Sequence, residues 1–353
     1  MNPYDFVRIN WNTGVKRDSP VPHNSFSGIS GQIHGTITTL KPFFIPESVV
    51  RSPRHYLVNG KREAIIPGSS LKGLIRSLVE TIGPGCWWLF DGTYDKLDYK
   101  NKLPRAFHQC PDRSGNLCIA CRMFGLIQQG GDMLHQGYVG FNDAVCAKPT
   151  EHPAIYTIIL GGPKPRHGEF YLDSTGKNVA GRKYYFHQST PPVDAKGWLP
   201  KGAPLERPAQ NTYIKPVGPE SIFDFSAHFN NLSQDDLHLL LYALVLEPNM
   251  RHQIGYAKPA GLGSVQIHLT RLETIDYTQR YSTANGGKTI YKEGELQNYL
   301  QRATSPFVRD AASITLQDLR RIWAWPGRDD IQYPGWQWFQ DPNNAQKDLS
   351  QTP

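Results

Sequence analysis

The feature that most constrains the fold is a long amphipathic helix pattern over residues 69–82. Its apolar residues recur at helical spacing and form one stripe, made of Leu71, Leu74, Ile75, Leu78, Val79 and Ile82. Ser69 or Ser70 can cap its start, and Gly83-Pro84 ends it. The pattern predicts a capped core helix that follows a short strand-like segment.

Further patterns place this helix beside a sheet. Residues 31–44 and 264–275 alternate as strands do, and shorter strand patterns cover 137–143 and 221–229. A second helix pattern begins at Ser233, with Asp236 completing a variant of the capping box. The order strand, helix, strands, helix, strand predicts an α+β fold with a ferredoxin-like or RRM-like core. Both helices are expected on one face of an antiparallel sheet.

Long insertions are expected between these short core elements, because the chain holds 28 prolines and 32 glycines. We predict that the core spans residues 1–275, with insertions at about 84–135 and 144–219. Residues 276–353 are expected to form a partly helical C-terminal extension packed on the core, with helices at about 292–303 and 316–325. Its aromatic cluster is expected to pack rather than to stack on bases, and consists of Tyr333, Trp336, Trp338 and Phe339.

Composition indicates an ordinary soluble globular protein, with 39% hydrophobic and 20% charged residues. No apolar run approaches the roughly 18 residues of a membrane span. Residues 1–12 lack the apolar segment of a signal peptide. We therefore expect a cytoplasmic protein without a membrane partner.

Basic residues gather before and within the first helix. The net charge is only +7, but residues 51–76 hold six basic residues against the single acid Glu63. Such a segment attracts a polyanion, and free N–H groups at a helix start favour phosphate. The predicted contacts are Arg51, Arg54, Ser69, Ser70, Lys72 and Arg76. The alternative is a solvated loop and helix face.

A second turn, at residues 254–263, is rich in glycine and leads into the last core strand. Gly255, Gly261 and Gly263 allow a ligand to approach the backbone closely, and Lys258 can reach phosphate. The loop precedes a strand rather than a helix, which argues against a dinucleotide-binding fold. We predict that Lys72 and Lys258 converge on one ribose-phosphate track. The alternative is a tight turn with no ligand.

The cysteines have the spacing of metal ligands. Cys118 and Cys121 form a Cys-x-x-Cys turn, Cys110 precedes them, and His108 lies just ahead of Cys110. Such a turn supplies two of the four ligands of tetrahedral zinc, and a cytoplasmic chain seldom uses it for disulfides. We predict a structural zinc site formed by His108, Cys110, Cys118 and Cys121. Competitors for the fourth place are Cys86, Cys146 and His135, and the alternative is a set of buried thiols.

Five stretches in this order resemble the RAMP superfamily of CRISPR-associated RNA-binding proteins. They are P-G-S-S-L-K-G at 67–73, C-I-A-C-R-M-F-G at 118–125, G-R-K-Y-Y-F-H at 181–187, the strand and helix at 221–246, and the glycine-rich loop. The resemblance covers residues from about 26 to 275. It extends to the backbone-type subunits of type III effector complexes, especially divergent subtype D-like systems.

The resemblance implies a guide-RNA-binding subunit that contacts target RNA and other RAMP subunits. It adds Arg182 and Lys183 to the expected RNA contacts. Related subunits cut target RNA with an aspartate in the loop after the first strand, yet this chain has none between Asp18 and Asp91. We therefore predict no catalytic residue of the usual kind.

Two alternatives stay open at this point. The first is an endoribonuclease that cleaves target RNA or matures guide RNA, for which His34, His55 or His252 would be the general base. The second is a zinc-stabilised scaffold that binds neighbouring proteins through its insertions.

Overall fold

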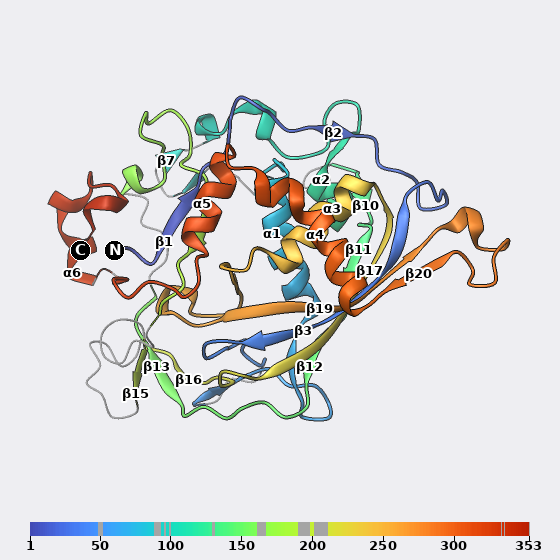
Figure 1. Cartoon of the computed structure of the whole chain (residues 1–353). Helices are drawn as coiled ribbons and strands as arrows, with labels where there is room; N and C mark the ends of the chain where they lie inside the picture. Colours follow the sequence, from blue (N-terminus) through green and yellow to red (C-terminus); the bar gives the residue numbers. More distant parts are fainter. Residues whose placement is uncertain are drawn as a thin grey trace.

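The computed structural model describes residues 1–48, 52–87, 93–94, 97–98, 100–128, 131–160, 167–189, 198–200, 211–332, 334 and 336–352. Its centre is an antiparallel sheet in the order β18–β19–β3–β17–β12–β5, with β11 also paired to β17 and β20 to β19 (Figure 1). The bounds are β3 (Ile29–Thr39), β5 (Ala64–Ile66), β11 (Val139–Phe141), β12 (Ala144–Cys146), β17 (Ile222–Leu232), β18 (His252–Gln253), β19 (Ser264–Ile275) and β20 (Lys288–Tyr291).

The chain order of the main elements confirms the predicted ferredoxin-like core. Strand β3 leads to α1 (Gly68–Ile82), then to β11 and β12, then to β17, α3 (Gln234–Val245) and β19. The last core strand pairs with the first, the first with the third, and the third with the second. This is the strand order expected of an antiparallel sheet with both helices on one face.

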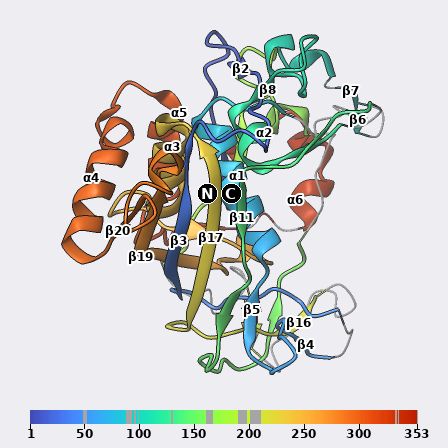
Figure 2. The same cartoon turned by 90° about the vertical axis from the view of Figure 1, so that its right-hand side faces the viewer.

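One continuous core joins the two helices to the sheet. Alternate residues of β3, such as Ile33 and Ile37, are fully buried and belong to one hydrophobic cluster with Ile75 of α1 and Leu240 of α3. Strands β3 and β17 lie side by side in this sheet (Figure 2). Figure 1 shows both helices above the strands. Strand alternation also places the intervening polar residues of β3, including His34, on the outer face of the sheet.

The insertions add small sheets and the short helix α2 (Ile119–Phe124). One sheet has the order β15–β13–β16–β4, from Trp198–Pro200, Ile155–Thr157, Tyr213–Lys215 and Arg54–His55. The N-terminal strand β1 (Tyr4–Val7) pairs with β14 (Arg182–Tyr185). The remaining pairs are β2 (Arg17–Asp18) with β8 (Leu117–Cys118), β6 (Thr93–Tyr94) with β7 (Leu97–Asp98), and β9 (Leu126–Ile127) with β10 (Leu134–His135).

The C-terminal segment contains α4 (Glu293–Arg309), α5 (Ile314–Ile322) and α6 (Trp336–Gln340). Buried residues of α4 and α5, including Leu296 and Leu319, belong to the main core. Trp338 stacks on His167 with ring centroids 5.5 Å apart, so this aromatic ring packs within the protein. Tyr333 lies outside the described residues, and the domain boundary at about residue 275 stays a prediction.

No helix among the described residues combines the length and the apolar character needed to cross a membrane.

Candidate functional site

A cleft of about 480 Å³ lies where α1, β14 and the glycine-rich loop meet. One side of α1 forms a wall, β14 forms another, and the start of the glycine-rich loop forms the third. The lining residues are Ile45, Pro46, Ser70, Gly73, Leu74, Ser77, Lys183, Tyr184, Tyr185, Gln253, Ile254, Gly255, Tyr256, Lys258 and Trp323. The first helix and the glycine-rich loop singled out in the sequence therefore share one cleft.

Helix α1 contributes a small polar face to the cleft. Ser70, Gly73 and Ser77 lie three and four residues apart, so they fall on the same side of the helix. The helix begins at Gly68 after Pro67, and no serine side chain caps it, contrary to expectation. Instead the Gly68 N–H donates to the Asp143 carboxylate at 2.8 Å. Because a carboxylate already occupies the helix start, a phosphate would contact α1 further along.

Strand β14 supplies a lysine surrounded by aromatic rings. Lys183 Nζ lies 3.6 Å from the ring centroid of Tyr4 and 5.0 Å from that of Tyr185. Desolvation, together with the nearby charge of Lys258, lowers the pKa of Lys183 to about 8. Lys258 Nζ lies 5.7 Å from the same Tyr185 ring, and desolvation lowers its pKa as well.

The glycine-rich loop is shaped by its own packing. Gly255 and Gly263 have φ values of 95° and 82°, which favour glycine. A Cβ on Gly255 would come within 2.7 Å of the Phe44 carbonyl oxygen, and one on Gly263 would overlap the Ile254 carbonyl. Lys258 Nζ donates to the Gly255 carbonyl at 3.0 Å. These glycines are therefore needed for the backbone conformation and close packing of the turn. The turn in this conformation places Lys258 at the cleft.

The charge of the cleft is positive. No Asp or Glu is among its lining residues. Within the described part of the chain, no carboxylate forms an ion pair with Lys183 or Lys258. Two ammonium groups that are partly desolvated and lack a carboxylate partner make an environment that favours an anion.

Several expected RNA contacts lie outside this cleft. Lys72 lies on a different side of α1 from Ser70 and does not line the cleft. The α1 residue that shares the cleft with Lys258 is therefore Ser70 and not the predicted Lys72. Arg51 lies outside the described residues. Among the others, the following do not line the cleft: Arg54, Ser69, Arg76, Arg182, Gly261 and Gly263. Arg76 and Arg182 are largely buried in ion pairs with Glu80.

A cluster of four buried cysteines lies behind α1. The Sγ atoms of Cys86, Cys110, Cys118 and Cys121 are all within 4.8 Å of one another. Cys86 and Cys121 are 3.6 Å apart at sulfur, and no disulfide joins any cysteine of the cluster. Hydrogen bonds among the thiols lower the pKa of Cys110 and raise that of Cys121.

The cluster fits a tetrahedral metal ion. Zinc–sulfur bonds of about 2.3 Å in a tetrahedron place the sulfur atoms about 3.8 Å apart, close to the spacing in this cluster. The backbone N–H of Cys118 donates to Cys110 Sγ at 3.2 Å, as commonly happens around thiolate ligands. The four residues could therefore hold one metal ion.

The fourth place in the cluster belongs to Cys86 rather than to His108. Cys86 follows the end of α1, which brings it to the Cys-x-x-Cys turn. His108 lies outside the cluster, and its Nε2 contacts the Leu103 carbonyl at 3.2 Å. Cys146 is buried in β12, and His135 contacts the Arg122 carbonyl.

Sequence reasoning missed two parts of this region. Tyr4, which covers Lys183, is 179 residues away along the chain and carries no motif. The buried network of Arg76, Glu80 and Arg182 was also missed. Its only trace in the sequence is the i,i+4 spacing of Arg76 and Glu80.

The histidines considered as general bases lie in three different places. His252 is buried, contacts the Ala243 carbonyl at 2.8 Å, and has its pKa lowered to about 4 by desolvation. His34 lies on the outer face of the sheet. His55 is in β4, and its carbonyl accepts a hydrogen bond from the Glu47 N–H beside the cleft residue Pro46.

The chain thus combines a ferredoxin-like fold with a cationic cleft and a cluster of four cysteines. A family model for the RAMP superfamily matches residues 36–266, and the chain belongs to that superfamily. Membership indicates a CRISPR-associated RNA-binding or nuclease function. A comparison with curated proteins found no matching relative.

Proposed function

We propose that this chain is a guide-RNA-binding subunit of a type III CRISPR ribonucleoprotein effector in the cytoplasm. It would help to position target RNA beside other RAMP subunits. The observation that carries the proposal is the pairing of Lys183 and Lys258 in a cleft that also presents Ser70 and Ser77 and is lined by no acid. Ammonium and hydroxyl groups suit the phosphate and sugar of an RNA backbone, which is bound without regard to sequence.

The contacts within the cleft form the centre of the proposed interface. Ser70, Lys183, Gly255 and Lys258 line it. Arg54, Ser69 and Lys72 are proposed as RNA contacts outside the cleft, and Arg51, outside the described residues, stays a predicted contact. Gly261 and Gly263 would act by holding the loop. Arg76 and Arg182 are assigned a supporting role, because both are committed to Glu80.

RNA binding at two or more salt concentrations tests the proposal. Lys183→Ala and Lys258→Ala should each weaken binding of single-stranded guide RNA and reduce the slope of log K against log salt by about 0.7. Lys292→Ala is the matched control, since Lys292 is exposed and does not line the cleft. Unchanged affinity and slope in both cleft variants would remove the cleft from the RNA path.

We also propose that the four-cysteine cluster holds structural zinc. Four buried thiolates around one tetrahedral ion leave no open ligand position, which is typical of a structural rather than a catalytic site. The ion would join the end of α1 to the insertion that carries Cys110, Cys118 and Cys121.

Endoribonuclease activity is the second candidate, favoured by the position of Glu47 and His55 next to the cleft residue Pro46. An assembly in which this chain is the only intact RAMP subunit tests it, with complementary RNA as substrate. Discrete products that disappear on Glu47→Ala or His55→Ala would establish the nuclease. Intact RNA would favour binding alone.

A further inference from the structure

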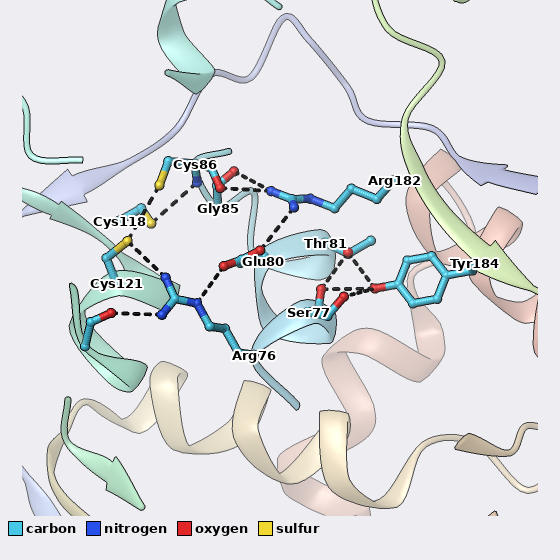
Figure 3. A network of polar contacts seen from close by, with 11 residues as sticks. Arg76, Ser77, Glu80, Thr81, Gly85, Cys86, Cys118, Cys121, Arg182 and Tyr184 are labelled. Carbon is cyan, nitrogen blue, oxygen red and sulfur yellow. Dashed lines mark hydrogen bonds and ion pairs between the residues drawn. The ribbon is translucent and has the colours of Figure 1, made fainter. Parts of the chain in front are cut away.

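Two sets of polar contacts lie between the four-cysteine cluster and the cleft (Figure 3): one joins the cluster to Arg182, and the other joins Tyr184 to α1. Arg76 Nη2 contacts Cys121 Sγ at 3.6 Å, and Arg76 Nε donates to Glu80 Oε1 at 2.8 Å. The other oxygen of Glu80 accepts from Arg182 Nη1 at 3.1 Å. Arg182 Nη2 then donates to the carbonyls of Gly85 and Cys86 at 3.2 and 3.0 Å. Both ends of the network thus reach the cysteine cluster.

The charges of this network complement a metal thiolate centre. The side chains of Arg76, Glu80 and Arg182 are only 15%, 12% and 14% exposed. Two guanidinium groups against one carboxylate give 2 − 1 = +1, whereas one zinc ion with four thiolates gives 2 − 4 = −2. The excess positive charge would therefore face a negative centre in the metal-bound protein.

Strand β14 links the network to the cleft, because neighbouring side chains on a strand point to opposite sides. Arg182 and Tyr184 turn toward α1, where the Tyr184 hydroxyl lies 2.7 Å from Thr81 Oγ1 and donates to the Ser77 carbonyl at 3.0 Å. Lys183, between them, points toward the ring of Tyr4. Lys183 lies next to Arg182 on the same four-residue strand, so contacts that fix Arg182 also restrain the position of Lys183 in the cleft.

We propose that Arg76, Glu80 and Arg182 are positioning residues that make the geometry of the cleft depend on metal at the cysteine cluster. With metal bound, the end of α1 and the segment at Gly85–Cys86 hold Arg182, and β14 keeps Lys183 at its place in the cleft. Without it, Arg182 loses a fixed partner and β14 loosens from α1. The inference about RNA affinity rests on the proposed function; the inference about β14 does not.

The experiment compares the full chain in its zinc-loaded form and after dialysis against a chelator. Hydrogen exchange of the backbone at Arg182–Tyr185 reports the position of β14, and binding of single-stranded guide RNA reports the cleft. Metal removal should increase exchange in β14 and weaken RNA binding about tenfold or more. In the loaded protein, Glu80→Gln should reproduce most of both changes, and metal removal from that variant should add little, because the two changes break one pathway.

Glu247→Gln is the matched control. Glu247 also bridges two partners in a largely buried site, the Tyr242 hydroxyl at 2.7 Å and Arg320 Nε at 2.9 Å, but it does not line the cleft. This variant should keep the wild-type RNA affinity and the full response to metal removal.

Other outcomes separate the two proposals. If metal removal leaves exchange at Arg182–Tyr185 unchanged and RNA affinity within twofold, the cluster stabilises only its own surroundings and the positioning role is refuted. If the stripped chain unfolds as a whole, loaded Glu80→Gln decides, and wild-type exchange with wild-type affinity in that variant overturns the inference. If the loaded wild-type chain binds no RNA, the proposed function fails, while hydrogen exchange still tests the positioning of β14.

Discussion

At the scale of single residues, the environment of Lys183 changes an ordinary lysine into a group that titrates near neutral pH. The rings of Tyr4 and Tyr185 and the charge of Lys258 lie close to its ammonium group. A pKa of about 8 lies well below the usual lysine value of about 10.4. RNA phosphate requires the protonated form, so the sign is clear: binding should weaken as pH rises through 8.

We expect RNA affinity to fall by up to about tenfold between pH 7 and pH 9, since a group of pKa 8 keeps roughly one proton in ten at pH 9. Binding titrations at constant salt measure this change. Lys183→Arg keeps its charge throughout and should show a flat profile over the same range. An identical pH response in wild type and Lys183→Arg would show that another group titrates.

The cysteine cluster gives a second prediction at this scale, because the structure separates Cys86 from His108. Cys86→Ser should lower bound zinc well below one ion per chain and reduce thermal stability. His108→Ala should keep stoichiometric zinc, since its ring contacts the Leu103 carbonyl instead. Metal analysis by mass spectrometry distinguishes the two, and the reverse result would restore His108 as the ligand.

At the scale of elements, the glycine-rich loop shows how a turn presents a side chain. Gly263→Ala should lower the free energy of unfolding by about 1–3 kcal/mol, because its φ of 82° is unfavourable for alanine and its Cβ would overlap the Ile254 carbonyl. Urea denaturation measures the change. Gly294→Ala is the control: a Cβ there meets nothing within 4 Å and the residue stands in the first turn of α4, so the free energy of unfolding should change by less than about 1 kcal/mol.

The elements with a clear period were predictable from the sequence. The helix at 69–82 and the strand at 264–275 match α1 and β19 almost to the residue, because each buries one stripe or face. Strands β1 and β14 were not predictable, since four residues without alternation of polarity carry too little pattern. The capping of α1 by Asp143 also depends on a contact 75 residues away.

For the candidate site, the sequence located the turns but not their partners. Lys258, Lys183 and Ser70 were expected and do share a cleft, while Lys72 follows the helix to another side. The Cys-x-x-Cys turn was visible as a local motif. Cys86 was only one of several competitors, because only the fold brings the end of α1 to that turn.

At the scale of the whole molecule, contacts between distant segments hold the core together. Asp318 in α5 accepts hydrogen bonds from the Arg8 backbone N–H at 3.0 Å and from Arg8 Nε at 2.7 Å. It also forms an ion pair with Arg321, and its side chain is only 4% exposed. This carboxylate therefore joins the strand β1 region to the C-terminal segment.

Asp318→Asn should lower the free energy of unfolding by about 1–3 kcal/mol, because Arg8 and Arg321 lose the charge of a buried acceptor. Thermal unfolding measures this loss. Asp330→Asn removes half of an exposed pair with Arg328, so its effect should stay below about 1 kcal/mol. Equal effects of the two substitutions would show that burial at Asp318 contributes nothing.

The lining of the cleft has a further consequence for how the protein responds to divalent salts. Hard cations such as magnesium require carboxylate or carbonyl oxygens for an inner-sphere site, and this surface offers two ammonium groups and no carboxylate. Magnesium added to fold an RNA would therefore not bridge an RNA phosphate to a carboxylate of this cleft. Under the proposed function, magnesium would compete with Lys183 and Lys258 for the phosphate oxygens and so release the RNA.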